Sequence, residues 1–170
     1  MFVLFAMVCP VGSVSRFSVV GFSGSRALRG VCVPVLRGAC GAVGSGSVVA
    51  VGCAGGVDGF VRSFFGSRAV VFRVGSFGSG RGAFARRSVA VVEWVASRGG
   101  CWVSFPVGAC PVGLVPSSSS RSCFAGFRSG SWSSLAFAVG LGVPCFVFLG
   151  RGAVGVPAWL RSCGGGWFVA

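Results

Sequence analysis

The hydrophobic residues of this chain fall into short runs that glycine and serine interrupt. Val48–Val51 and Ala69–Phe72 are two such runs, and their content of valine and phenylalanine is typical of β-strands. No run continues as a longer alternation of apolar and polar residues. The pattern therefore predicts scattered short β-prone segments rather than an extended sheet with one polar face.

Residues 83–98 are the longest stretch without Gly or Pro. Arg98 would lie in the last turn of a helix here, and Gly99 and Gly100 follow as helix-stop residues. Four valines in the stretch favour a strand, but a run of this length exceeds the usual strand. We expect a short helix over residues 83–98.

Residues 129–150 are uncharged and lie between Arg128 and Arg151. Their length suffices to cross about 30 Å of hydrocarbon, and Trp132 could lie at a membrane interface. Three serines at the start, and two glycines and a proline after the middle, weaken a continuous helix. The segment predicts a short helix within residues 131–150 and is a candidate membrane segment.

The rest of the chain shows no domain boundary that can be assigned from sequence. The first nine residues are apolar but lack the basic segment with which a signal peptide starts, since the first basic residue is Arg16. A signal peptide is therefore not expected. The segments we distinguish are a Gly- and Ser-punctuated apolar region (1–82), the expected helix (83–98), a Pro- and Ser-rich linker (99–128), the candidate membrane segment (129–150) and a Gly-rich tail (151–170).

The residue types that are missing alter this picture. Lys, Ile, Thr, Asn, Gln, His and Tyr do not occur among the 170 residues, although Lys is common in ordinary proteins. Every codon for these residues has adenine at its first or second position. Codons without adenine there encode ten residue types, which account for the whole chain except Met1, Met7, Asp58 and Glu93. A coding strand that is poor in adenine explains the composition.

The same bias explains why the reading frame is open. Phe is abundant, with 17 residues, so the strand is rich in G and T rather than simply GC-rich. All stop codons contain adenine, and such a strand meets few of them. We therefore interpret the chain as the product of a spurious or very young open reading frame without an evolved biochemical function.

The fold expected from this composition is a mostly irregular, low-complexity chain rich in Gly, Val, Ser and Phe, without a confident globular fold. The chain contains 31 Gly and only 10% charged residues, and its mean hydropathy is +0.88. Glycine inside helices and strands destabilises them by roughly 0.5–1 kcal/mol each. Exposed Val and Phe segments without charged neighbours also favour aggregation.

The charge supports two alternatives. Fifteen Arg oppose Asp58 and Glu93, which gives a net charge of +13. A basic chain can bind anionic lipid or RNA, so one alternative is a small membrane-associated protein, located at a membrane if it accumulates. The other is an Arg/Gly/Phe-rich RNA-binding protein, because Phe is interleaved with Arg and Gly over residues 60–87 and 121–130. The arginines are scattered, however, and only Arg86 and Arg87 are adjacent.

The sequence offers little catalytic chemistry. Asp58 and Glu93 are the only acids and lie far apart in the chain, and without His a serine nucleophile has no partner of the usual kind. The Gly-rich stretch 75–82 lacks the dinucleotide-binding spacing, and without Lys a P-loop is excluded. We predict no enzyme activity and assign no catalytic or cofactor-binding residue and no cofactor.

The cysteines do not predict a metal site. No pair has the C-x-x-C spacing, and no His can complete a zinc site. Arginine lies two residues before Cys123 and Cys163, where it could favour a thiolate, but we expect inert thiols. The nine cysteines are residues 9, 32, 40, 53, 101, 110, 123, 145 and 163.

Overall fold

The computed structural model describes residues 10–170. The apolar run 1–9 lies outside the described residues. The prediction that it is not a signal peptide concerns only these residues. The strands are β1 (Val19–Gly24), β2 (Val48–Gly52), β3 (Ala69–Phe72), β4 (Cys101–Phe105), β5 (Cys145–Phe148), β6 (Arg161–Gly164) and β7 (Trp167–Val169). The α-helices are α1 (Val33–Gly41), α2 (Gly56–Phe65), α3 (Arg81–Ala96), α4 (Ser120–Cys123) and α5 (Gly130–Gly140), and the 3-10 helices are η1 (Pro10–Arg16), η2 (Gly66–Arg68) and η3 (Val74–Phe77).

The strands form one sheet in the order β3-β2-β1-β4-β5-β7-β6. Strands β1 to β5 pair in parallel, whereas β7 is antiparallel to both β5 and β6. The chain runs outward from β1 to β3, and α3 then brings it back to place β4 on the other side of β1. The order of strands along the sheet thus reverses between β1 and β4.

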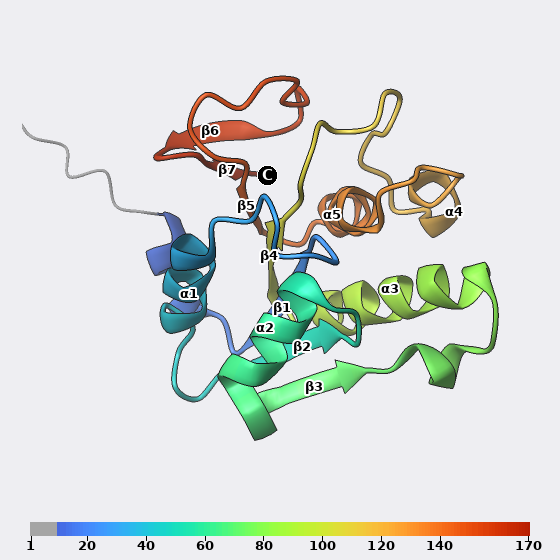
Figure 1. Cartoon of the computed structure of the whole chain (residues 1–170), viewed down its shortest axis with the longest axis horizontal. Coiled ribbons are helices and arrows are strands. Elements are labelled where there is room, and N and C mark those ends of the chain that lie inside the picture. Colours follow the sequence, from blue (N-terminus) through green and yellow to red (C-terminus); the bar gives the residue numbers. More distant parts are fainter. Residues whose placement is uncertain (1–9) are drawn as a thin grey trace, which may run out of the picture.

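Helices cover both faces of the sheet (Figure 1). Buried residues of α1 and α2 belong to one hydrophobic cluster, and those of α3 and α5 belong to the other. Neighbouring residues of one strand alternate between the two clusters: Val103 packs with α1 and α2, and Trp102 packs with α3 and α5. The architecture is therefore a doubly wound α/β sheet.

The expectation of a mostly irregular, low-complexity chain is wrong. A strand that is buried on both faces is apolar at successive positions, so it lacks the alternation that marks a half-exposed strand. Val48–Val51 belongs to such a strand, because Val49–Val51 are buried in β2. Ala69–Phe72 forms β3, which lies at the edge of the sheet and is only partly buried. The ordered α/β fold conflicts with low complexity and weighs against an unselected reading frame.

The helix expected over residues 83–98 is present as α3, which begins and ends two residues earlier. The candidate membrane segment 129–150 is instead divided into α5 and β5. Every residue from Trp132 to Ala138 is buried, because the sheet, α3 and the 106–128 connection pack around the helix. A helix that is apolar on all sides is then a core helix. Within residues 10–170, no helix has the length and apolar character that a membrane span requires.

Two segments interpreted from composition contain parts of the sheet. Residues 99–128, interpreted as a linker, include the central strand β4. Residues 151–170, interpreted as a Gly-rich tail, include the hairpin strands β6 and β7. Proline after β4 and glycine beside β6 mark the connections of these strands and not a lack of structure.

Candidate functional site

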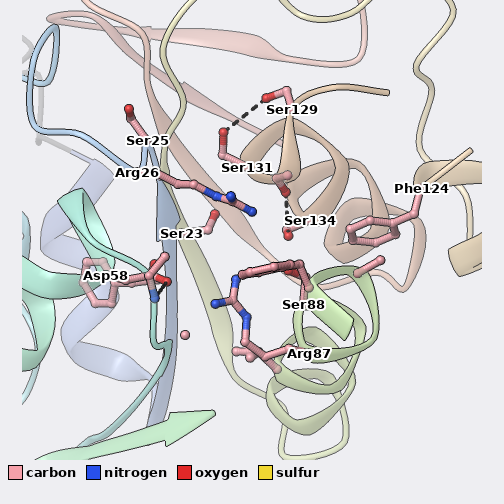
Figure 2. A pocket seen from close by; sticks show the side chains of 18 of the residues that line it. Ser23, Ser25, Arg26, Asp58, Arg87, Ser88, Phe124, Ser129, Ser131 and Ser134 are labelled. Carbon is pink, nitrogen blue, oxygen red and sulfur yellow. Dashed lines mark hydrogen bonds between the residues drawn. The ribbon is translucent and has the colours of Figure 1, made fainter. Parts of the chain in front are cut away.

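A crevice of about 510 Å³ opens at the carboxyl ends of β1, β2 and β4. The loop after β1, the start of α2, one face of α3 and the start of α5 line it (Figure 2). It lies where the strand order reverses between β1 and β4. In open α/β sheets this position is the usual place of a ligand, because the loops on either side diverge there.

Arg87 is the most unusual residue of the crevice. It lies on α3, is only 7% exposed, and points into the cavity (Figure 2). Its Nη1 donates to Cys53 Sγ at 3.7 Å, whereas its Nε has no hydrogen-bond partner among the described residues. A buried guanidinium with an unused donor is costly unless an anion satisfies it. The residue therefore favours an anionic ligand.

Asp58 faces the same cavity from the first turn of α2. Its Oδ2 accepts a hydrogen bond from the Ala54 N–H at 3.2 Å. Burial raises the pKa of Asp58 above its ordinary value, against the opposing effects of the Arg87 charge, the Ala54 N–H and the charges of Arg62 and Arg26. The carboxylate is thus an acceptor that orders the loop after β2.

A glycine permits the close approach of these two side chains. A Cβ at Gly52 would lie 2.5 Å from Asp58 Oδ2 and 2.9 Å from Arg87 Cζ. Arg62 fixes the loop that follows, because its Nη1 donates to Gly52 O at 2.9 Å and to Ala54 O at 2.7 Å. Hydrogen bonds between side chains and backbone groups therefore fix the end of β2 and the loop after it, which line the crevice.

The amino-terminal end of α5 forms the opposite wall. Ser129 caps the helix, since its Oγ accepts from the Trp132 N–H at 3.4 Å. Ser129, Ser131 and Ser134 lie across the cavity from Arg87 (Figure 2), and Arg128 precedes them. The first N–H groups of a helix have no partner inside it and carry partial positive charge. This wall is suited to an anion.

Aromatic side chains complete the lining. Phe84, Trp102, Phe124 and Phe127 border the cavity. The guanidinium of Arg26 lies 4.8 Å from the centre of the Phe84 ring. The crevice thus combines planar apolar surfaces with three arginines and one carboxylate, and its net charge is positive when that carboxylate is ionised.

Trp102 is also fixed by hydrogen bonds at the base of the crevice. Its Nε1 donates to Ser23 Oγ at 3.0 Å, and that hydroxyl lies 3.1 Å from Ser104 Oγ. These three buried residues connect β1 to β4 across the point where the strand order reverses. The base of the crevice is accordingly a rigid part of the sheet.

The structure separates the two acids that the sequence contains. Asp58 is buried in the crevice, whereas Glu93 is exposed and borders a groove between α3 and α4 with Arg86 and Arg121. They form no carboxylate pair. Within residues 10–170, no group of three His, Cys, Asp or Glu residues could hold a metal ion.

Two other features considered from the sequence, Cys123 and the Gly-rich stretch 75–82, lie outside the crevice, whereas the stretches 60–87 and 121–130 contribute to its lining. Cys123 is buried, and burial raises the pKa of its thiol against a backbone hydrogen bond at Ser117. The Gly-rich stretch 75–82 contains part of η3 and the first two residues of α3. Neither contributes to the lining of the cavity.

Sequence reasoning missed Arg87 and the α5 wall. The sequence shows that Arg86 and Arg87 are adjacent. Only their positions on α3 show that Arg87 faces inward and Arg86 faces outward. The Ser-Gly-Ser tract at 129–131, directly before an apolar helical run, is an N-cap pattern that could have been recognised.

The fold and the crevice together define a class: a doubly wound α/β protein with a basic crevice at its switch point. Comparisons with protein-family models, with curated proteins and with solved structures find no match for this chain.

Proposed function

We propose that the crevice binds a nucleoside phosphate. The observation that carries this proposal is the buried Arg87 guanidinium, whose Nε lacks a partner among the described residues and which faces the cavity at the switch point of the sheet. It differs from the interpretation drawn from composition, a spurious or very young reading frame without an evolved function, which stays a prediction. The proposal concerns binding, and the absence of enzyme activity expected from the sequence stays a prediction.

The polar groups of the crevice favour a phosphate. Arginine matches phosphate oxygens with several donors at once. The start of α5 adds backbone N–H groups, partial positive charge and the hydroxyls of Ser129 and Ser131. Arg87 and this helix start lie on opposite walls, so an anion between them would be contacted from two sides.

The shape and the aromatic lining favour a nucleoside attached to that phosphate. The volume of about 510 Å³ falls within the range of about 300–1,000 Å³ that is typical of small-molecule sites. Phe84, Phe124 and Phe127 offer apolar surface against which a base can pack. A free phosphate would leave this surface unused.

Isothermal titration calorimetry with AMP, ADP, adenosine, ribose 5-phosphate and inorganic phosphate tests the proposal. We expect AMP or ADP to bind at least about tenfold more tightly than the compounds that lack either the base or the phosphate, because each part contributes its own contacts. Equal affinity for adenosine and AMP, or no binding of either nucleotide, would contradict it.

Two neighbouring residues provide a matched pair of variants. Arg87→Met removes the buried guanidinium and is expected to weaken AMP binding about 10- to 100-fold, the worth of one charge-assisted hydrogen bond. Arg86→Met removes an exposed guanidinium that donates to Phe77 O outside the crevice and should leave the affinity unchanged. Circular dichroism of both variants checks that they fold.

The RNA-binding alternative stays a prediction and can be examined in the same assay. A single-stranded RNA oligonucleotide that binds through scattered arginines should lose affinity steeply with added salt. Because Arg86 is exposed and Arg87 is buried, RNA binding should also depend more on Arg86 than on Arg87. A nucleotide bound in the crevice should depend on Arg87 instead.

A further inference from the structure

Cys53 lies beside the crevice in an environment unlike that of the other thiols described here. It directly follows β2, and its chain neighbours Gly52 and Ala54 line the cavity. The residue is half-buried. Its Sγ accepts hydrogen bonds from the Val74 N–H at 3.1 Å and from Arg87 Nη1 at 3.7 Å.

Two donors directed at one sulfur favour the thiolate over the thiol. A neutral thiol has a proton to donate, as in Cys123 and Cys145, whose Sγ atoms lie 3.5 Å from Ser117 O and 3.1 Å from Val143 O. At Cys53 the sulfur is the acceptor. Burial opposes its ionisation, but the Val74 N–H and the hydrogen bond and charge of Arg87 outweigh burial, and the pKa of Cys53 is lowered.

Arg87 supplies an independent second feature. Its Nε is buried, has no hydrogen-bond partner among the described residues, and belongs to the same guanidinium that contacts the sulfur. The positive charge of this guanidinium lies beside the sulfur and would stabilise an oxygen that develops negative charge there.

We propose that Cys53 is a reactive thiolate, assisted by Arg87, that is oxidised by hydroperoxides to a sulfenic acid. The Cys53 sulfur attacks the terminal oxygen of the peroxide, an S–O bond forms and the O–O bond breaks. The sulfur loses two electrons and the peroxide gains them, and the leaving alkoxide or hydroxide takes a proton from water. The transferred oxygen keeps its own hydrogen, which yields Cys–SOH, and a thiol reductant can reverse the change.

This inference goes beyond the proposed function, since it requires no bound nucleotide. The two ideas share Arg87 but fail separately. Loss of nucleotide binding leaves the peroxide reaction of the free protein in place, and an unreactive Cys53 leaves the nucleotide site in place.

The test treats the full chain with hydrogen peroxide in the presence of dimedone, which traps sulfenic acids, and measures labelling of each cysteine by peptide mass spectrometry. Cys32, which is exposed, serves as the internal reference. We expect Cys53 to be labelled several-fold to about tenfold faster than Cys32 near neutral pH, because the rate follows the thiolate fraction. Equal or slower labelling of Cys53 would overturn the proposal.

Variants and a pH profile separate reactivity from mere exposure. Arg87→Met should reduce labelling of Cys53 to about the rate of Cys32, whereas Arg86→Met should not change it. In the wild-type protein, alkylation of Cys53 by iodoacetamide should reach half its maximal rate below the ordinary thiol pKa of about 8.5. This profile needs no variant to fold, and a midpoint at or above the ordinary value would refute the thiolate.

Discussion

Gly21, in strand β1, is a position where the effect of one added methyl group can be worked out from its neighbours. A Cβ built there would overlap the Trp102 ring and lie 2.9 Å from Val95 Cγ2. Both neighbours are buried, Trp102 at 2% and Val95 at 0% exposure. The Gly21→Ala variant must therefore displace the indole, and with it the hydrogen bond from Trp102 Nε1 to Ser23 Oγ.

The cost has two parts. Overpacking of a filled core costs about 1–3 kcal/mol, and loss of one buried hydrogen bond costs about 0.5–1.5 kcal/mol. We expect Gly21→Ala to lower the free energy of unfolding by roughly 2–4 kcal/mol. At roughly 2–4 °C per kcal/mol for a chain of this size, Tm should fall by roughly 5–15 °C.

Urea denaturation monitored by tryptophan fluorescence and circular dichroism measures this effect. The matched control is Gly38→Ala, which makes the same chemical change on the exposed side of α1, where no atom lies within 4 Å of the new Cβ. Replacing glycine by alanine inside this helix should raise the free energy of unfolding by about 0.5–1 kcal/mol. In a Trp102→Leu background, Gly21→Ala should cost less than about 1 kcal/mol, because the ring it displaces is absent. An equal cost in both backgrounds would refute the packing argument.

Three further predictions concern the walls of the crevice. Since the pKa of Asp58 is raised in the folded protein, its ionisation disfavours folding, and the wild type should lose stability relative to Asp58→Asn as the pH rises above the ordinary Asp pKa of about 3.9. Urea titrations at several pH values measure this, and a constant difference would contradict it. Ser129→Ala removes the cap that accepts from the Trp132 N–H and should cost about 1 kcal/mol in thermal unfolding; an unchanged Tm would show that the cap contributes nothing. Arg62→Met removes two hydrogen bonds to the loop after β2 and should cost roughly 2–4 kcal/mol and weaken AMP binding; unaltered AMP affinity would mean that this loop does not shape the site.

Local pattern located some elements of this fold but could not assemble them. The β-prone runs at β2 and β3 and the helix at α3 depend on neighbouring residues, and sequence reasoning found them. The pairing of β1 with β4 joins segments about eighty residues apart, and no local pattern encodes it. The hairpin of β6 and β7 was hidden because glycine dominates its connection.

The segment 129–150 shows how apolar length misleads. A continuous hydrophobic stretch fits a membrane span, but it equally fits a buried helix followed by a buried strand. The decisive residues were Gly142, which adopts a left-handed φ of 75° after α5, and Pro144, which stands directly before β5. Both residues are typical of a turn between a helix and a strand. The high hydropathy of the segment as a whole favoured a single membrane span instead.

The composition bias and the fold are compatible because a bias restricts residue types and not their positions. Valine suits strands, alanine and leucine suit helices, and glycine suits turns, so the ten common residue types suffice for a doubly wound sheet. The positions of residues on helix α3 illustrate this at the crevice. Phe84, Arg87, Ser88 and Val91 follow helical spacing and line the crevice, whereas Arg86 lies outside it. An adenine-poor coding strand would account for arginine at both positions, but it would not account for the burial of the inward-facing one against a cysteine at a basic cavity.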